Sequence, residues 1–337
     1  MNECSHSVAL IACPNGMGHA RRMTVLANSL VSLGCDVSLF LPYYAKDKLK
    51  VFLPDKRIKK HFIKIDSVED VIADPARFMR SIGSLDDFDQ VISDNCVEIL
   101  RFRQDAWLSG SFLWHETGVP WLEHSYVLES RALLADLQPR MISSVLFSAS
   151  YLSECTRLHE VGLYDLGVKP QPNTINKDSI LISCGLGGPL ERQTADFVSW
   201  LSRRDLPASV IKRVWVDPNL VPKSAPTWMQ PADFSSAMYT SVRASVARPG
   251  VGVVTDSLSH GAKIFAFFED QNHEMRDNAA KLEISEVGKR CSSVFDAYKL
   301  AFSYANSPSA MRCFDSAHGR IKFGGGQEAA SLVVSMT

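Results

Sequence analysis

The sequence predicts an α/β protein with two Rossmann-like domains whose parallel sheets face each other across a cleft. A short apolar run, a glycine-bearing turn and an amphipathic stretch follow one another near the start of the chain, and this succession returns near its middle. Alternating strands and helices are typical of parallel sheets, which bind ligands beyond the carboxyl ends of their strands. The 337 residues suffice for two domains of about 100–200 residues each.

The first occurrence of the pattern begins with the apolar run 7–13, which has the composition of a buried parallel strand. The turn-forming residues 14–18 follow it, and apolar residues at helical spacing then predict a helix over 19–33. Gly34 is a natural stop for that helix, and the run 36–42 predicts a second strand. Together these segments form a βαβ unit with glycines in its first loop.

The second occurrence consists of a strand over 179–184, a glycine-rich loop over 185–189, an amphipathic helix over 191–204 and a strand over 212–217. The segment 162–178 between the two occurrences is rich in Gly, Pro and Asn, which is typical of a linker.

These boundaries predict an N-terminal domain over 1–165 and a C-terminal domain over 175–320. The remaining segment, 321–337, is predicted to carry a tail helix over 327–336 after a flexible spacer at 324–326, where three glycines follow one another.

Composition and charge exclude several classes of protein. The chain has 36 lysines and arginines against 37 aspartates and glutamates, so its overall charge does not favour nucleic acid. No apolar run approaches the roughly 20 residues of a membrane-spanning helix, and the N-terminus lacks the basic region of a signal peptide. The eight cysteines form no CxxC pair, so we expect reduced thiols, a cytoplasmic location and no metal site. The DxD-like segment 87–89 precedes a strand and is predicted to be a solvated turn.

The first-loop residues Gly16 and Gly18 let the backbone approach a ligand closely, and they lie where a strand meets a helix N-terminus. His19 follows them, and an imidazole at that place can act as a general base near neutral pH. The alternative is a histidine that caps the helix or holds the loop.

Two further candidates follow apolar runs of the N-terminal half. Asp94 ends the predicted strand 88–95, where it could bind an acceptor, orient His19 or cap the next helix. His115 and Glu116 follow another apolar run and could line the acceptor side, or else belong to a surface loop. Asp94 and Glu116 are the next candidates for the catalytic base if His19 is structural.

The strongest signal lies in residues 243–282. A strand leads into a loop with Arg248, Gly250 and Gly252, and a helix follows it. The helix N-terminus and the glycines favour a phosphate group. Asp256, in that helix, is suited to accept hydrogen bonds from ribose hydroxyls.

The next strand leads into a polar loop that runs into a helix. Gln271 and Glu274 lie in this stretch. Their amide and carboxylate groups are suited to bind sugar hydroxyls.

Residues 43–65 carry eight lysines and arginines against two aspartates, with aromatic residues between them. This pattern indicates either a surface that meets anionic lipid headgroups or an ordinary solvated face.

The order of these residues resembles the donor site of the GT-B glycosyltransferases, closest in kind to the UDP-GlcNAc transferase of peptidoglycan synthesis. The shared donor pattern is an R-x-G, an acidic residue, a glycine, a strand and a polar loop ending in N-A, which correspond to Arg248, Gly250, Asp256, Gly261 and Asn278. The pattern G-x-G-H-x-x-R, which ends at Arg22, resembles the first-loop motif of that group, and the loop 185–188 resembles its inter-domain glycine loop.

The resemblance implies a role for each matching residue. Arg248, Gly250 and Gly252 would bind the donor phosphates, and Asp256 would take the ribose position. His19 would take the position of the N-domain residue near the reacting centre. The other residues assigned to the donor are Gly185, Gly187, Gly188, Gln271, Glu274 and Asn278.

The implied activity is transfer of a sugar from a nucleotide diphosphate sugar, above all a UDP-sugar, to an acceptor hydroxyl. It is a hexosyltransferase reaction, inverting and metal-independent, and it needs no cofactor because the nucleotide sugar is a substrate. The donor would bind the C-terminal domain, and a glycan, lipid-linked or small-molecule acceptor the N-terminal one. We expect a cytoplasmic protein, with peripheral contact at the inner face of the membrane through residues 43–65.

Other functions stay open at this stage. They are a nucleotide-sugar hydrolase or epimerase on the same scaffold, and a non-catalytic subunit that binds a nucleotide sugar or a partner.

Overall fold

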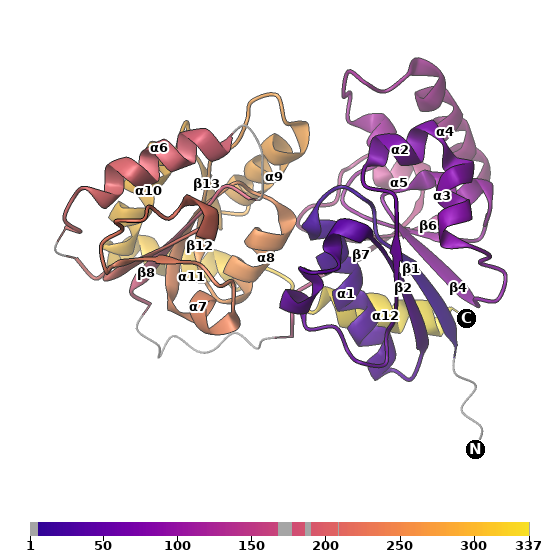
Figure 1. Cartoon of the computed structure of the whole chain (residues 1–337), viewed down its shortest axis with the longest axis horizontal. Coiled ribbons are helices and arrows are strands. Elements are labelled where there is room, and N and C mark those ends of the chain that lie inside the picture. The colour runs from indigo at the N-terminus through magenta and orange to yellow at the C-terminus, as the bar shows by residue number, and fades with distance from the viewer. Residues whose placement is uncertain (1–5, 168–176, 186–189, 208, 337) are drawn as a thin grey trace. The chain divides into compact units, whose positions relative to one another are not determined.

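The computed structural model describes residues 6–167, 177–185, 190–207 and 209–336. The chain divides into two compact units, which Figure 1 shows with their elements labelled. Unit 1 comprises Met1–Leu166 together with Lys322–Thr337, and unit 2 comprises Gly167–Ile321. Predicted Gly187 and Gly188 lie outside the described residues.

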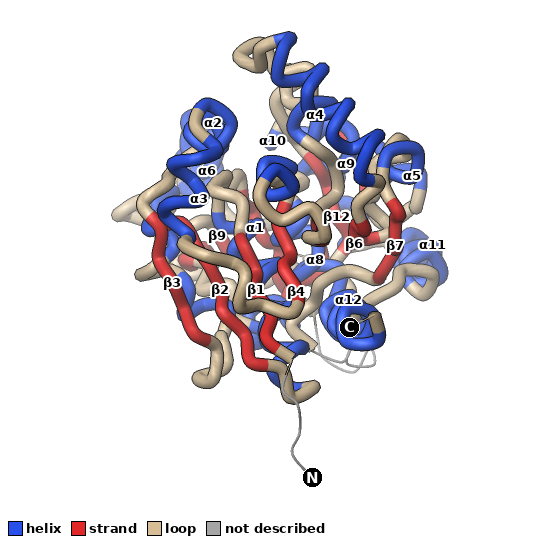
Figure 2. The backbone as a smooth tube through the Cα atoms, turned by 90° about the vertical axis from the view of Figure 1, so that its right-hand side faces the viewer, coloured by secondary structure: helices blue, strands red, loops and turns tan. Residues whose placement is uncertain are grey.

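Unit 1 is built on a seven-stranded sheet in the order β3-β2-β1-β4-β5-β6-β7, in which every pair of neighbours is parallel. Figure 2 shows β3, β2, β1 and β4 side by side. The strands are β1 (Ser7–Ile11), β2 (Asp36–Pro42), β3 (Lys59–Ile63), β4 (Gln90–Asp94), β5 (Trp107–Ser109), β6 (Arg140–Ser144) and β7 (Arg157–Val161).

Alternate residues of the strands enter two separate cores. In β1, Val8 and Leu10 join the core beneath α1 and α12, whereas Ala9 and Ile11 join the core beneath α2 and α3. The sheet is therefore covered on both faces, which explains its unbroken apolar strands. The helices of unit 1 are α1 (Met17–Ser32), α2 (Val68–Ala73), α3 (Pro75–Ile82), α4 (His124–Leu137), α5 (Leu152–Cys155) and α12 (Gly325–Ser335), with 3₁₀ turns η1 (Tyr43–Ala45), η2 (Leu49–Phe52), η3 (Val97–Arg101) and η4 (Trp114–Glu116).

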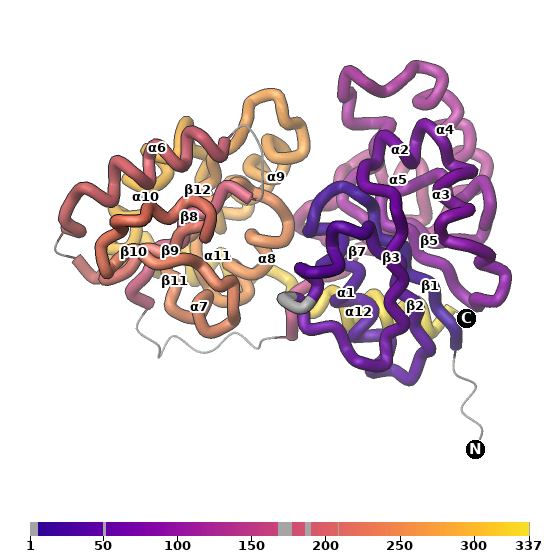
Figure 3. Tube along the Cα trace, in the orientation of Figure 1, coloured from indigo at the N-terminus to yellow at the C-terminus, as the bar shows by residue number. Residues whose placement is uncertain are grey.

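Unit 2 is built on a six-stranded parallel sheet in the order β10-β9-β8-β11-β12-β13, which Figure 3 traces as a tube. Its strands are β8 (Ser179–Ser183), β9 (Arg213–Val216), β10 (Met229–Pro231), β11 (Val242–Ala247), β12 (Lys263–Ala266) and β13 (Gly288–Arg290). Its helices are α6 (Leu190–Ser202), α7 (Ser236–Ser241), α8 (Val251–Ser259), α9 (His273–Ile284), α10 (Val294–Ala305) and α11 (Pro308–His318), with a 3₁₀ turn η5 (Pro218–Leu220). The predicted fold class, two Rossmann-like domains with parallel sheets, is confirmed.

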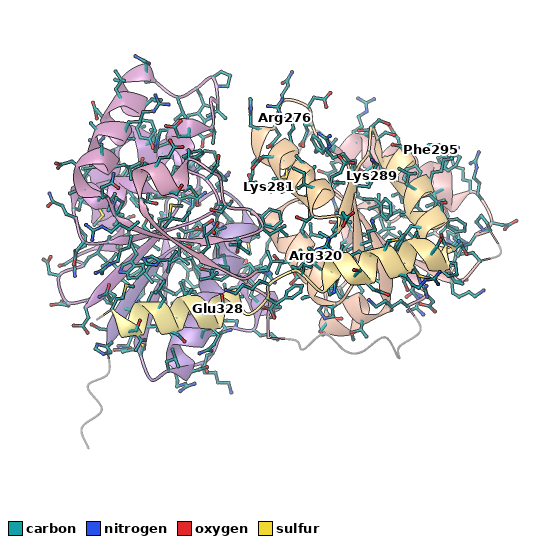
Figure 4. The ribbon with its side chains drawn as sticks, turned by 180° about the vertical axis from the view of Figure 1, so that it is seen from behind. Arg276, Lys281, Lys289, Phe295, Arg320 and Glu328 are labelled. Carbon is teal, nitrogen blue, oxygen red and sulfur yellow. The ribbon has the colours of Figure 1, made fainter. Side chains whose placement is uncertain are left out.

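The C-terminal helix returns to unit 1. Its Glu328, labelled in Figure 4, accepts a hydrogen bond of 2.9 Å from the backbone N–H of Gly162. A Cβ on Gly325 would lie 2.0 Å from the carbonyl oxygen of Gly162, and one on Gly326 would lie 2.7 Å from Val25. The prediction of a flexible glycine spacer is therefore wrong, because two of these glycines open the helix and allow its close packing.

No helix in the described part of the chain is long and apolar enough to cross a membrane.

Candidate functional site

The first loop of unit 1 brings glycine backbone to the carboxyl end of β1. Gly16 has a φ of 90° and forms the N-cap of α1. Its N–H donates a hydrogen bond of 2.8 Å to Tyr44 Oη, and a Cβ at Gly16 or Gly18 would meet nothing within 4 Å. The loop is thus held from one side while its glycines border open space.

His19 and Asp94 meet at the end of the sheet. His19 lies in the first turn of α1, and Asp94 is the last residue of β4, the strand beside β1. Their Nδ1 and Oδ2 atoms are 2.8 Å apart, and Asp94 is fully buried. No side chain caps α1, and η3 has Cys96 at its N-cap without a side-chain hydrogen bond. Of the alternatives that the sequence left open, the geometry favours Asp94 as the residue that orients His19.

Arg22, one turn after His19 on the same face of α1, completes this group. Its Nε donates to Asp94 Oδ1 at 3.0 Å, and its Nη2 donates to the same oxygen. In the sequence, Arg22 stands at the end of a motif that gives no indication of its partner. Its charge was visible in the sequence, but its pairing depends on residues far apart in the chain.

The charges of this group decide which of its members is ionised. Burial opposes ionisation of Asp94, but the charges of Arg22 and His19 outweigh it and hold the pKa of the Asp94 carboxyl below its usual range. Burial disfavours the charged form of His19, yet the charge and hydrogen bond of Asp94 together with the Cys13 side chain outweigh it and raise the pKa of the imidazole. Asp94 is therefore a fixed anion, and His19 is the group that titrates.

Two buried thiols border the pair, and the sequence analysis did not single them out. Cys13 follows β1, and its side chain hydrogen-bonds that of Cys96. The Cys13 side chain also interacts electrostatically with His19. The hydrogen bond to Cys13 and the burial of the side chain both raise the pKa of the Cys96 thiol.

His115 and Glu116 lie in η4 and do not join this group. Glu116 accepts two hydrogen bonds from Arg131 of α4, at 2.6 and 2.8 Å, which lower the pKa of its carboxyl. The His115 side chain is 1% exposed and its Nε2 lies 3.5 Å from Glu116 Oε1, while burial lowers its pKa to about 4. Within the described residues, no hydrogen bond or ion pair joins either side chain to His19 or Asp94.

In unit 2 the loop after β11 leads into an open helix N-terminus. Gly250 is the N-cap of α8, and Gly252 lies in the first turn. No side chain caps this end and no acidic residue lies in the first turn, while a Cβ at Gly250 would meet nothing within 4 Å. Backbone N–H groups at such an end are suited to an anion.

Arg248 has a partner that the sequence analysis missed. Its Nε lies 3.1 and 3.3 Å from the two carboxylate oxygens of Glu269, in the loop after β12. Both side chains are partly exposed. An exposed ion pair of this kind contributes little stability, so Arg248 can exchange Glu269 for another anion at small cost.

The other predicted donor residues take different places. Asn278 is buried in α9, and its amide donates to the carbonyl of Pro249 at 3.0 Å, so it supports the loop instead of standing free toward a sugar. Gln271 is exposed, Glu274 lies in the first turn of α9, and Asp256 is half-buried in α8.

The loop after β8 is held by a residue that the sequence did not reveal. Asp217 follows β9 and accepts a hydrogen bond of 2.8 Å from the backbone N–H of Cys184. Burial raises the pKa of the Asp217 carboxyl. Gly185 follows with a φ of 79°, a conformation that suits glycine.

Among the described residues, no group of three or more His, Cys, Asp and Glu side chains is arranged to hold a metal ion.

The chain is similar to known proteins in its fold but not in its sequence. No protein-family model and no curated protein sequence matches the chain. The crystal structure of LpCGTa in complex with UDP is similar, with a TM-score of 0.71, 17% identity and coverage of 98% of this chain and 99% of that one.

Two further solved structures are similar to this chain over almost its whole length. The glycotransferase of kitacinnamycin has a TM-score of 0.65 at 13% identity, and UGT2 of Phytolacca americana, in complex with UDP-2-fluoro-glucose and pterostilbene, has 0.66 at 13%. Both comparisons cover 98% of this chain and 99% of the other. The chain has the GT-B fold of these proteins, whereas a closer relation to the UDP-GlcNAc transferase of peptidoglycan synthesis is not supported.

Proposed function

We propose that the protein is a glycosyltransferase that moves a sugar from a nucleotide diphosphate sugar, a UDP-sugar, to an acceptor hydroxyl. The observation that carries the proposal is the 2.8 Å contact between His19 Nδ1 and Oδ2 of the buried Asp94 at the carboxyl end of the unit 1 sheet. The fold supports it, because similar structures hold UDP or UDP-2-fluoro-glucose. Unit 1 would bind the acceptor and unit 2 the donor.

The pair sets up His19 as the base. A carboxylate can only accept hydrogen bonds, so His19 donates from Nδ1 and keeps the lone pair on Nε2. Nε2 takes the proton of the acceptor hydroxyl while the hydroxyl oxygen attacks the anomeric carbon. The bond from that carbon to the diphosphate oxygen breaks, and its electron pair leaves with the diphosphate. A single displacement of this kind inverts the anomeric configuration.

The leaving diphosphate gains negative charge as the bond breaks. In unit 2 the uncapped N–H groups of α8 and the guanidinium of Arg248 are suited to stabilise it. These groups supply positive charge from the chain itself, and on this ground we propose transfer without a metal ion. Asp256 is proposed for the ribose, and Gln271 and Glu274 for the sugar.

Replacing His19 by alanine tests the proposal. We expect turnover to fall about 10²–10⁴-fold, the usual contribution of a positioned base. UDP affinity should stay unchanged, because His19 belongs to unit 1. Single-turnover rates and calorimetric titration with UDP on the same folded variant measure both quantities. Near-normal turnover of the variant would refute the assignment of His19.

A hydrolase is the second candidate, since a basic Nε2 can deprotonate water as well as an acceptor hydroxyl. Product analysis without acceptor distinguishes the two reactions. Rapid release of free sugar and UDP indicates hydrolysis, whereas slow cleavage that an acceptor accelerates indicates transfer. UDP-sugar binding without turnover on any acceptor would instead indicate a non-catalytic subunit.

For residues 43–65 we propose peripheral contact with the inner face of the membrane. Leu53 is 75% exposed. Tyr43 is half-exposed, and the ammonium group of Lys46 lies 5.6 Å from the centre of the Tyr43 ring. Exposed apolar groups among lysines suit an anionic lipid surface. Co-sedimentation with phosphatidylglycerol-containing vesicles should exceed that with phosphatidylcholine alone, and Leu53→Glu should abolish the difference. Equal sedimentation with both would leave residues 43–65 as a solvated face.

A further inference from the structure

Arg22 and His19 divide the two oxygens of Asp94 between them. Arg22 binds Oδ1 through Nε and Nη2, while His19 Nδ1 lies 2.8 Å from Oδ2. Arg22 thus occupies one carboxylate oxygen with two donors and leaves the other oxygen to the imidazole. A lysine ammonium is a point charge on a flexible stem and cannot impose that orientation.

Arg22 also acts on His19 directly. Its Nη2 lies 3.3 Å from His19 Nδ1, which is close for two groups that both carry positive charge when the imidazole is protonated. The charged or titratable groups that face His19 are Asp94 from β4, Arg22 from α1 and Cys13 from the loop after β1. Asp94 and Cys13 favour the imidazolium, whereas Arg22 disfavours it.

We propose that Arg22 is a positioning residue that orients Asp94 toward His19 and opposes protonation of the imidazole. The inference rests on the proposed function, in which His19 is the base. A buried carboxylate alone would favour the protonated imidazole, and a protonated histidine cannot take a proton from an acceptor. Arg22 neutralises part of that carboxylate charge, so His19 stays oriented while its Nε2 remains available.

Asn95 and Gly110 lie beside the guanidinium of Arg22 and help to fix its position. Arg22 is buried, and its Nη2 lies 3.5 Å from the amide oxygen of Asn95. Asn95 has a positive φ of 57°, and a Cβ on Gly110 would lie 1.5 Å from that same oxygen. Gly110 thus leaves the space that the Asn95 amide occupies beside Arg22.

The test compares Arg22→Met and Arg22→Lys with the wild-type protein. The titration of His19 is followed by NMR, with its signal assigned by its loss in His19→Gln. Without the guanidinium, the His19 midpoint should move to higher pH, because the charge that opposed protonation is gone. The acidic limb of the pH–rate profile should move in the same direction, so turnover is lost more at low than at high pH. The His19 midpoint of Arg22→Lys should lie between that of the wild-type protein and that of Arg22→Met.

Arg21→Met is the matched control. Arg21 is the neighbouring buried arginine of α1, and its Nη1 donates to the carbonyl of Tyr164 at 2.8 Å. Its loss should lower thermal stability and leave the His19 midpoint in place. An equal shift in this variant, or an unchanged or lowered midpoint in Arg22→Met, would overturn the proposal. If Arg22→Met does not fold, Arg22→Gln, which also removes the positive charge but keeps hydrogen-bond donors, decides by the same criterion.

The NMR titration separates this inference from the proposed function, because it needs no turnover. If His19→Ala keeps its activity, the proposed base is wrong, whatever the titration shows. If His19→Ala is inactive and the titration does not respond to Arg22, only the role of Arg22 is wrong.

Discussion

The two candidate sites of this protein are organised in opposite ways. In unit 1 Asp94 and Arg22 are buried, His19 is partly buried, and the three side chains are already paired, with Asp94 between His19 and Arg22. In unit 2 the helix N-terminus at Gly250 is uncapped and borders open space, and Arg248 forms only a partly exposed ion pair. Buried charges need permanent partners in the protein, whereas solvent-accessible backbone N–H groups and a partly exposed arginine can remain available to bind an anion.

The difference matches the chemistry proposed for each unit. A base must keep one orientation and one protonation state before the acceptor arrives, so its partners belong to the protein. A phosphate-binding loop must exchange its partner in every turnover, so its groups stay accessible. Substitutions should therefore affect mainly stability and turnover in unit 1, and mainly donor affinity in unit 2.

Removing Asp94 should have the largest effect on stability. Asp94→Ala leaves the buried Arg22 and the partly buried His19 without their anion, and breaking a buried charge pair costs about 3–5 kcal/mol of unfolding free energy. Asp94→Asn keeps an acceptor oxygen and should cost less. Urea unfolding of both variants measures the effect. A loss below about 0.5 kcal/mol in Asp94→Ala, as for an ordinary surface substitution, would contradict the contrast between the two sites.

Removing Arg248 should have the next largest effect, and on binding only. Arg248→Ala should weaken UDP binding by about 1.5–3 kcal/mol, the value of a charge-assisted hydrogen bond. Glu269→Gln should act in the opposite direction, because it removes the carboxylate that competes with the diphosphate for Arg248. Calorimetric titration with UDP measures both variants, with Glu283→Gln as a control. Unchanged UDP affinity in Arg248→Ala would remove Arg248 from the donor site.

The pH dependence of stability should show a smaller effect, to which two histidines of unit 1 contribute. The pKa of His115 is lowered from 6.5 to about 4 by burial, so the unfolded chain binds this proton first and stability falls as pH drops from about 6.5 toward 4. The pKa of His19 is raised, so its contribution is present below 6.5 and is lost as pH rises through its folded-state value.

Two variants separate these contributions in urea unfolding at several pH values. His115→Gln should reduce the loss of stability as pH falls below 6.5, and His19→Gln should reduce the loss of stability as pH rises above 6.5. If His115→Gln shows the wild-type slope between pH 4 and 6.5, the burial of His115 does not control its titration.

The places of the two glycine loops could be predicted from local sequence. The run 7–13 and the run 179–184 each end at glycines, and a strand followed by a glycine turn and a helix has few alternatives. The structure confirms strands at Ser7–Ile11 and Ser179–Ser183. His19 and Gly250 could be found in this way, because each stands a few residues from the end of its strand.

The partners of these residues could not be predicted in the same way. In the sequence, Asp94 is more typical of a helix cap, Glu269 is part of a polar loop, and the place of Asn278 in a motif does not reveal its buried role. The return of the C-terminal helix to unit 1 was missed as well, because glycine suggests flexibility in a sequence and also permits close packing in a structure.

The sequence by itself determined the alternation of strands and helices and the glycine loops that end two of the strands, because periodicity and turn residues act over a few neighbouring positions. Only the tertiary structure decided that Asp94 meets His19 and Arg22. That contact exists because β4 lies beside β1, although more than fifty residues separate them in the chain. The order of strands in a parallel sheet depends on how its helices pack over both faces, and no local pattern of residues records it.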